Sequence, residues 1–350
     1  MVEQRMMRAV VQDGYGPYER LTIGEVPIPE PGDDEIRIRV LASSVHADVW
    51  HAVTALPFVL RFFGNGISRP KQPVPGTDLC GIVDIVGSGV TTFEVGDRVY
   101  GEPVAAKQWI SAGTLAEYAT APAASMHPVP EGITDEEAAS LPTSAVIALE
   151  VLRGEASIQP ADTVLINGAG GAVGVHAVQI AKAMGAEVTA VDRADKLPKL
   201  SELGADHVID FQAEDFTTNG IVYDVVLDIA SNRPFDDVKE SVKPEGNYVL
   251  VGHAGYSYTK RRWIGEVGTF ARLMARSPFD ERLKLGSRQK DPPPMEAVAA
   301  LVETGELKGV VAATFPLDQV VSAMQLVTSG DATGRVVISM AADNGTDNAA

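Results

Sequence analysis

The sequence Asn167-Gly168-Ala169-Gly170-Gly171-Ala172-Val173-Gly174 decides the fold class, because it follows a short apolar run at 163–167 and opens a helical pattern at 172–184. A glycine loop between a strand and a helix is typical of a βαβ unit that binds a dinucleotide. Glycines let the backbone turn tightly, let a pyrophosphate approach the free N–H groups of the helix, and let the helix pack close to the strand. A glycine-rich turn without a ligand is the alternative. We expect the loop to bind a cofactor through Gly168, Gly170, Gly171, Ala172, Val173 and Gly174.

The choice between NADH and NADPH depends on Asp192 and Arg193, which follow the next predicted strand at 187–191. Asp192 stands near the ~20th position after the glycine loop, where an acidic side chain accepts hydrogen bonds from the adenosine ribose. It therefore favours NADH. Arg193 favours NADPH, because a guanidinium can pair bidentately with a 2′-phosphate. Both coenzymes stay open, with a preference for NADH, and Asp192 could instead cap the following helix.

Strand-like runs alternate with helical patterns across the second half of the chain. Helical patterns at 172–184 and 196–203 lie between predicted strands at 163–167, 187–191, 207–209, 224–228, 248–251 and 282–285. Strand, helix and strand in turn imply right-handed crossovers and a parallel sheet that is covered on both faces. This part of the chain is therefore predicted to be a doubly wound α/β domain.

The two ends of the chain have a different texture. The first 130 residues are rich in glycine and proline and contain runs such as 36–40 and 81–87, which indicate short strands of a mostly β domain, with a loop at 56–71. Near the other end, the sequence predicts helices at 295–304 and 317–328 and strands at 310–314 and 335–339. We interpret this end as a return to the first domain, and residues 341–350 as a disordered tail.

Charge and composition exclude several functions. The 350 residues include 29 Lys and Arg against 47 Asp and Glu, so the net charge is −18. This field repels phosphate backbones and anionic lipids, and no run approaches the ~20 apolar residues that span a bilayer. We therefore expect no nucleic-acid partner and no membrane partner. The one cysteine, Cys80, allows no internal disulfide, and the N-terminus shows no apolar leader, so a cytoplasmic location is expected.

Several further motifs accompany the glycine loop in one order along the chain. They are EVPIPEPG at 25–32, ASSVH at 42–46, PGTDLCGIV at 75–83, VGDRV at 95–99, AASLP at 138–142, VQIAK at 178–182 and LGADHVID at 203–210. With them the sequence resembles the medium-chain dehydrogenase/reductase superfamily, specifically its zinc-lacking quinone oxidoreductase branch. The resemblance implies a GroES-like, mostly β catalytic domain made from both chain ends, at 1–128 and 289–340, and a Rossmann dinucleotide-binding domain inserted at 129–288.

The resemblance also implies where the cofactor lies. NAD(P)H would occupy the cleft between the domains, with Ala230, Val251 and Gly252 beside the nicotinamide, at the carboxyl ends of strands where an open α/β sheet binds its ligands. Arg335 matches a basic position that reaches the cofactor pyrophosphate in this superfamily. A solvated arginine at the end of a strand is the alternative for Arg335.

The positions that match a catalytic zinc site do not carry its usual ligands. Zinc alcohol dehydrogenases of the superfamily use a cysteine, a His-Glu pair and a second cysteine, whereas this chain has His46, Thr77-Asp78 and the cysteine-free stretch 141–148. A catalytic zinc needs about three protein ligands. We therefore expect no zinc. The alternative is an unorthodox metal site that combines His46 with His51, Asp48 and Asp78.

Without a metal to polarise an alcohol, an electron-poor acceptor is the better substrate class. Hydride transfer to a quinone, or to the β-carbon of an α,β-unsaturated carbonyl, needs proximity to nicotinamide C4 and a hydrogen-bond donor for the developing oxyanion. His46 is the candidate catalytic donor, because an imidazole can donate a hydrogen bond and transfer a proton. It could instead only orient the nicotinamide.

These observations together predict a zinc-independent NAD(P)H-dependent oxidoreductase that acts on a small-molecule acceptor. A homodimer is also expected, because 282–285 could pair as an exposed edge strand across a two-fold axis. The alternatives are a carbonyl reductase or alcohol dehydrogenase of the same superfamily, and a non-catalytic nucleotide-binding scaffold that keeps the fold.

Overall fold

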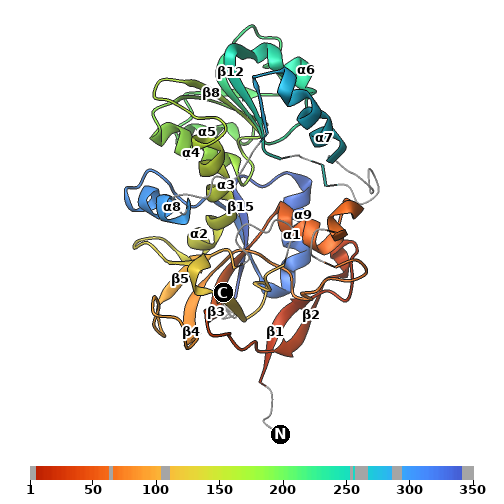
Figure 1. Cartoon of the computed structure of the whole chain (residues 1–350), viewed down its shortest axis with the longest axis vertical. Coiled ribbons are helices and arrows are strands. Elements are labelled where there is room, and N and C mark those ends of the chain that lie inside the picture. The colour runs from red at the N-terminus through yellow and green to blue at the C-terminus, as the bar shows by residue number, and fades with distance from the viewer. Residues whose placement is uncertain are drawn as a thin grey trace, which may run out of the picture.

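The computed structural model describes residues 5–62, 66–103, 111–252, 255–256, 267–285 and 294–340. Their strands form one large sheet in the upper part of Figure 1 and another in the lower part. A two-stranded sheet of β1 (Met6–Val11) and β2 (Thr22–Pro27) lies at the lower end. The predicted tail at 341–350 falls outside the described residues.

The upper sheet has six strands, all parallel, in the order β10-β9-β8-β11-β12-β13. In its third strand, Val164 and Ile166 belong to one apolar core and Leu165, between them, belongs to another. Both faces of the strand are therefore buried, as in a doubly wound sheet, and the predicted fold class is confirmed. The strands are β8 (Thr163–Asn167), β9 (Glu187–Asp192), β10 (His207–Asp210), β11 (Tyr223–Asp228), β12 (Val242–Leu250) and β13 (Leu283–Leu285).

The helices between residues 135 and 276 begin where local signals place them, and the first of them packs against the lower sheet. The helix that follows the glycine loop starts at Gly174, two residues later than predicted, because Ala172 and Val173 still belong to the turn. Another starts after Thr134, whose side chain forms a capping box with Glu137. The helices are α2 (Asp135–Ser140), α3 (Pro142–Arg153), α4 (Gly174–Ala183), α5 (Leu197–Glu202), α6 (Phe235–Val238) and α7 (Val267–Arg276).

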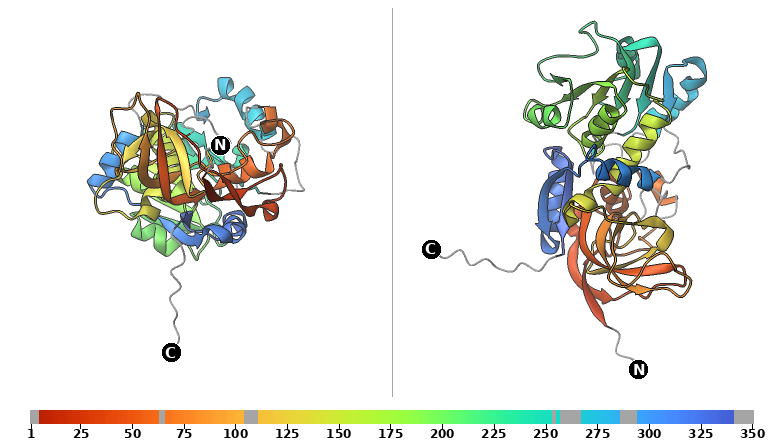
Figure 2. Two further views of the ribbon diagram at one scale, coloured as in Figure 1. Left: turned by 90° about the horizontal axis from the view of Figure 1, so that it is seen from below. Right: turned by 90° about the vertical axis from the view of Figure 1, so that its left-hand side faces the viewer.

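The lower sheet joins the two ends of the chain. Its order is β14-β15-β3-β4-β5-β7, and β6 also pairs with β3. The last strand lies antiparallel to β3, with Val336 opposite Val45, and Figure 2 shows the blue C-terminal strands beside the red and orange N-terminal ones. The strands are β3 (Glu35–Val45), β4 (Leu79–Val86), β5 (Arg98–Gly101), β6 (Tyr118–Pro122), β7 (Met126–Pro128), β14 (Val311–Pro316) and β15 (Arg335–Ser339). The domain boundaries at 128/129 and 288/289 stay predictions, and the second lies outside the described residues.

The helical content near the chain ends differs from the prediction. The first 130 residues, which are predicted to be mostly β, contain α1 (Ala47–Thr54). The predicted loop at 56–71 contains a 3₁₀ helix, Phe58–Phe62. The helix predicted at 317–328 is divided into a 3₁₀ turn, Leu317–Gln319, and α9 (Val320–Ser329). Helix α8 (Pro294–Glu303) matches its prediction closely.

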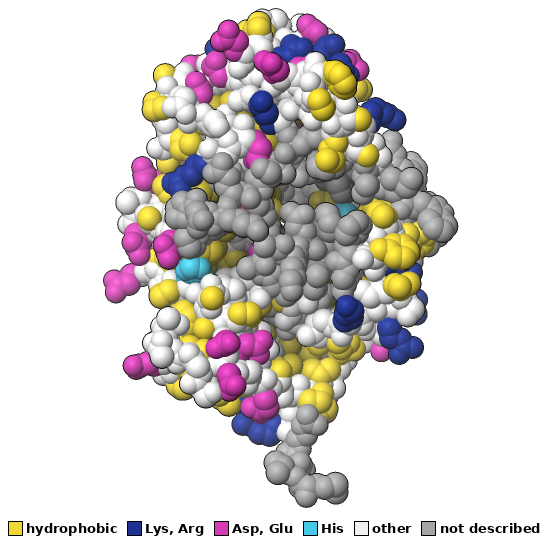
Figure 3. All heavy atoms as spheres, viewed as in Figure 1, with side chains coloured by type: hydrophobic (Ala, Val, Ile, Leu, Met, Phe, Trp, Pro, Cys, Tyr) yellow, Lys and Arg dark blue, Asp and Glu magenta, His cyan; other side chains and the backbone are white. Residues whose placement is uncertain are grey.

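The surface carries its charges in mixed order. On the face shown in Figure 3, Asp and Glu side chains are spread over the described atoms and are interspersed with Lys and Arg. Within the described ranges, no helix combines the length and the apolar character that crossing a bilayer requires.

Candidate active site

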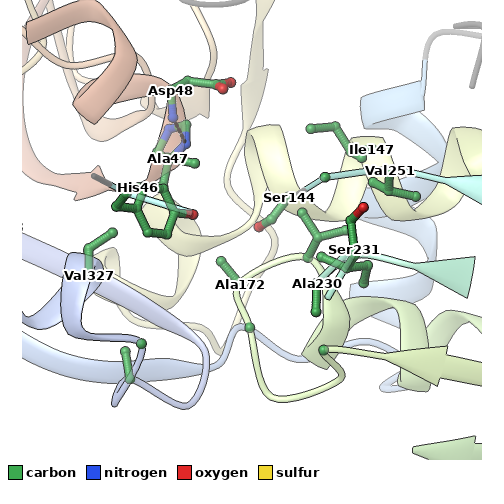
Figure 4. A pocket seen from close by; sticks show the side chains of 18 of the residues that line it. His46, Ala47, Asp48, Ser144, Ile147, Ala172, Ala230, Ser231, Val251 and Val327 are labelled. Atoms are coloured by element: carbon green, nitrogen blue, oxygen red, sulfur yellow. Dashed lines mark hydrogen bonds between the residues drawn. The ribbon is translucent and has the colours of Figure 1, made fainter. Parts of the chain in front are cut away.

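A cavity of about 700 Å³ lies between the upper and the lower sheet and is lined by residues from both parts of the molecule. In Figure 4, His46 and Asp48 lie on one side of it, and Ala172, Ala230 and Val251 lie on the other. The lining brings together most of the predicted site residues, namely His46, Gly168, Gly171, Ala172, Val173, Asp192, Arg193, Ala230, Val251, Gly252 and Arg335.

Gly170 and Gly174 are the two predicted loop residues that do not line the cavity. A Cβ on Gly174 would lie 2.5 Å from the carbonyl oxygen of Ala169, and a Cβ on Gly170 would lie 2.5 Å from Cδ of Lys196. A side chain has no room at either position, so these two glycines allow the loop to pack closely against its neighbours inside the protein. Gly171 is different, because a Cβ there would meet only the Gly168 oxygen, at 3.3 Å. It leaves space in the cavity beside the start of α4, where the N–H groups of a helix favour an anion.

Asp192 closes the loop from the end of β9. Its Oδ2 accepts a hydrogen bond from the Gly170 N–H at 2.8 Å, and its Oδ1 accepts one from the Arg193 N–H at 2.9 Å. The alternative role as a helix cap does not appear, since α5 begins at Leu197 and no side chain caps it. Asp192 therefore holds the glycine loop and faces the same cavity.

Arg193 and Lys196 line the cavity, and both cations are hydrogen-bonded to the turn between α9 and β15. The Arg193 guanidinium donates to both carboxylate oxygens of Asp195, at 3.1 and 2.9 Å, and to Asp331 at 2.7 Å. The Lys196 ammonium donates to the carbonyl oxygens of Gly330 and Ala332, at 2.8 and 2.9 Å. Sequence reasoning missed these contacts, because residues 330–332 lie more than a hundred positions away and carry no motif.

The carboxyl ends of β11 and β12 form the opposite end of the cavity. Beneath them, the buried Asp228 accepts hydrogen bonds from Asn167 Nδ2 at 2.9 Å, the Ser231 N–H at 2.7 Å and the Tyr248 hydroxyl at 2.7 Å. Burial raises the pKa of Asp228, while these donors lower it. This network fixes the turn that presents Ala230 to the cavity.

His46 forms the floor of the cavity on the side of the lower sheet. Its Nε2 lies 2.6 Å from the Thr77 hydroxyl, and its Nδ1 accepts a weak hydrogen bond, 3.4 Å long, from the Asp48 N–H at the start of α1. With Nδ1 as acceptor, a neutral ring carries its proton on Nε2 and donates it to Thr77. Burial, followed by the nearby Arg335 and His51, holds the pKa of His46 well below its ordinary value. The ring is therefore neutral.

Asp78 lies behind His46 and is bonded on all sides. It accepts hydrogen bonds from Ser44 at 2.9 Å, from Thr143, and from the Arg335 guanidinium at 2.6 Å. Arg335 is only 1% exposed, so it is not the solvated strand-end residue of the alternative interpretation. It lines the cavity while its charge is balanced by Asp78.

The positions that match a zinc site do come together in space, but their side chains do not fit the metal. Catalytic zinc takes three ligands from His, Cys and carboxylate side chains. Here His46 is hydrogen-bonded to the hydroxyl of Thr77, and the Asp78 carboxylate is paired with Arg335. No group of three His, Cys, Asp or Glu side chains within the described part of the chain is placed to hold a metal ion.

Comparisons with known proteins agree with this architecture. Residues 32–131 match the alcohol dehydrogenase GroES-like domain, 136–231 the C-terminal domain of alanine dehydrogenase/PNT, and 203–338 the zinc-binding dehydrogenase domain. The chain is 30% identical to the chloroplastic quinone-oxidoreductase QR1 of Triphysaria versicolor and 28% identical to the chloroplast envelope quinone oxidoreductase homolog of Arabidopsis thaliana. Both matches cover 95% of this chain and 98% of the relative.

The fold likewise matches a solved structure, that of the quinone oxidoreductase from Coxiella burnetii, with a TM-score of 0.80 and 26% identity. The match covers 96% of this chain and all of that one. The architecture of a GroES-like and a Rossmann unit, with a cavity between them, is therefore that of enzymes that use a nicotinamide cofactor. The chain belongs to the medium-chain dehydrogenase/reductase superfamily, in its quinone oxidoreductase-like branch, and is an oxidoreductase.

Proposed function

We propose that this protein is a zinc-independent, NADH-dependent oxidoreductase that reduces a quinone or an α,β-unsaturated carbonyl compound. One observation carries the proposal: the polar side chains at the positions that match the zinc ligands are already engaged in hydrogen bonds and an ion pair. Arg335 is paired with Asp78, and His46 is hydrogen-bonded to Thr77. An acceptor that is already electron-poor needs no Lewis acid. The names of the quinone oxidoreductase relatives support the same acceptor class.

The cavity has the side chains that such a reaction requires. When bound, the nicotinamide supplies the hydride. Ala172, in the turn before α4, leaves space for the cofactor pyrophosphate, and the small residues Ala230 and Gly252 leave room for the ring. Ile147 and Val251 add apolar walls that exclude water from the acceptor. We propose NADH as the donor, since Asp192 faces the cavity where the adenosine ribose would lie.

His46 is proposed as the donor of a hydrogen bond to the acceptor oxygen. Its Nε2–H is directed to Thr77, so an acceptor oxygen has to share or replace that contact. A His46→Ala variant should lower kcat/KM for the acceptor by about 10²-fold, the range for loss of one such donor, without changing the Kd for NADH. His46→Gln, which keeps an N–H group, should recover part of this loss. Unchanged kcat/KM for every acceptor would show that His46 only orients neighbouring groups.

The proposed reaction is tested with purified protein that has been dialysed against a chelator. Oxidation of NADH should be followed with a benzoquinone, a naphthoquinone and an enone, and the saturated ketone that corresponds to the enone is the matched control. We expect turnover of the quinones or the enone that chelation does not reduce, and much slower turnover of the ketone. Activity that appears only after zinc is added, or that is confined to simple ketones and alcohols, would overturn the proposal.

A further inference from the structure

We propose that Asp331 sets the coenzyme preference of this enzyme by holding the Arg193 guanidinium away from the 2′-phosphate of NADPH, so that the site selects NADH. The inference rests on the proposed function, because it concerns the nicotinamide coenzyme of the same cavity. It assigns a role in specificity to a residue that comes from the lower sheet, in the turn between α9 and β15.

Carboxylates already bind the Arg193 guanidinium in the structure. Nε and Nη2 donate to the two oxygens of Asp195, and Nη1 donates to Asp331. All three guanidinium nitrogens are therefore engaged. A phosphate is recognised by the same kind of paired N–H groups. Because these three bonds use three of the five N–H groups, a 2′-phosphate has to compete with Asp195 and Asp331 for the guanidinium.

The same turn also binds the second cation at this end of the cavity. Lys196 lines the cavity with Arg193, and its ammonium is bonded to the carbonyl oxygens of Gly330 and Ala332, on either side of Asp331. The turn is anchored to the glycine loop, because the Gly334 N–H donates to the Gly170 oxygen at 3.0 Å. One segment thus holds both basic side chains.

The charges around Arg193 also favour NADH over NADPH. Two cations, Arg193 and Lys196, stand against three carboxylates, those of Asp192, Asp195 and Asp331. A ribose hydroxyl tolerates this excess of negative charge, whereas a 2′-phosphate is repelled by it. Asp195 is only two positions from Arg193 and moves with it. Asp331 is contributed by a distant part of the chain, the turn between α9 and β15. Its removal should therefore change the preference for NADH over NADPH most directly.

The test measures binding rather than turnover. Kd values for NADH and NADPH should be obtained from nicotinamide fluorescence, and those for adenosine 2′,5′-bisphosphate and ADP by calorimetry, at one fixed salt concentration. We expect the wild type to bind NADH at least about tenfold more tightly than NADPH, and Asp331→Asn to narrow that ratio by about fivefold. The bisphosphate should gain affinity in the variant, and ADP should not.

Matched variants separate this role from a general change in charge. Asp331→Glu keeps a carboxylate in the turn and should keep the wild-type ratio. Asp318→Asn removes an exposed aspartate elsewhere in the same segment of the chain and should also leave the ratio unchanged. Adding Arg193→Gln to Asp331→Asn should abolish the gain in NADPH affinity, since the gain comes from the released guanidinium.

The outcomes distinguish this inference from the proposed function. A wild type that prefers NADPH, or a ratio that Asp331→Asn changes by less than about twofold, overturns the role of Asp331 even if quinones are reduced. The expected shift in a protein that reduces neither quinones nor enones supports the role of Asp331 and overturns the proposed reaction. Binding of neither coenzyme overturns both.

Discussion

At the scale of single residues, the buried pair of Asp78 and Arg335 is costly to form, because both groups carry a charge. Both side chains are essentially inaccessible to solvent, at 0% and 2% exposure. Removing two charges from water costs several kcal/mol per ion, and the cost is recovered only when each charge finds close partners. Ser44, Thr143 and Arg335 meet this condition for Asp78. The buried Asp78 carboxylate therefore depends on all three of these partners.

Loss of the Asp78 charge should destabilise the whole protein. Asp78→Asn removes the one carboxylate that is hydrogen-bonded to the buried Arg335 cation among the described residues, so we expect the free energy of unfolding to fall by about 3 to 5 kcal/mol. Urea unfolding followed by circular dichroism measures the change. Asp236→Asn is the matched control, because its 62% exposed carboxylate also pairs with cations, Lys239 and Arg276. That control should lose less than about 1 kcal/mol; an equal loss in both variants would contradict the prediction.

His176 is a further buried titratable group, and its burial has a consequence for the pH dependence of stability. Burial, and then the nearby Arg335, lowers the pKa of His176 from 6.5 to about 3. Its contribution to stability is complete above pH 6.5 and is lost as the pH falls from 6.5 toward 3, because the unfolded chain binds the proton first. In His176→Gln, the loss of unfolding free energy with falling pH should be shallower by about 1.4 kcal/mol per pH unit within this interval. Parallel wild-type and variant curves would contradict this.

Sequence patterns predicted which residues form the site better than they predicted the contacts between those residues. Local rules identify Asp192 and the glycines, because strand, turn and helix are set by neighbouring positions. The partners of Asp78 and Arg193 could not be predicted in this way. Arg335 is 257 positions from Asp78 and Asp331 is 138 positions from Arg193, so only the folded topology brings these charges together.

At the scale of elements, the joint between β8 and α4 depends on glycine for two different reasons. Gly168 has a φ of +85°, a conformation that glycine adopts without strain. Gly174 lies so close to the backbone of residues 168 and 169 that a side chain has no room. Close packing of α4 on the loop is what places the helix N-terminus at the cavity.

Two single-methyl substitutions separate packing from ligand space in this joint. Gly174→Ala should force the loop and helix apart, lower the unfolding free energy by roughly 1 to 3 kcal/mol and weaken NADH binding. Gly171→Ala adds the same methyl group where only one oxygen lies near, so stability should change by less than about 0.5 kcal/mol. Thermal unfolding and NADH titration of both variants provide the comparison. Equal destabilisation by the two substitutions would refute the distinction.

Helix α1 shows why one element escaped prediction. Residues 47–54 lie in a region dominated by short strands and glycine, and their eight positions give a weak periodic signal. The structure supplies what the pattern lacks: the His46 side chain caps the first turn, and Val49, Trp50 and Val53 are buried in the core of the lower sheet. Tertiary packing, rather than propensity, makes this helix.

At the scale of the whole molecule, the outer strand of the upper sheet predicts that the protein associates with another chain. β13 pairs with β12 on one side and is the last strand in the sheet order. Next to it, Phe279 is 88% exposed and Met274 is 54% exposed. An edge strand flanked by exposed apolar side chains is a template for pairing with another chain. We predict that it pairs with a second copy of this protein.

Light scattering at micromolar concentration should therefore give twice the mass of one chain. Phe279→Asp should shift the protein toward the monomer, because it places a charge beside the edge strand. Phe62→Asp is the matched control, since Phe62 is 72% exposed in the 3₁₀ helix Phe58–Phe62, which follows α1 and does not belong to the upper sheet. A wild-type monomer, or dissociation by both substitutions alike, would remove the prediction.

The position of β15 inside the lower sheet has a consequence for biosynthesis. The strands of the upper sheet are contiguous in sequence, from Thr163 to Leu285, so this sheet can close as soon as that segment leaves the ribosome. β3 ends at Val45, yet its neighbour β15 begins only at Arg335. Pairings across such sequence distances form late. The lower sheet, whose first strands are made early, is thus completed last during translation. Until β15 emerges, residues 42–45 of β3 lack their antiparallel partner and Asp78 lacks Arg335.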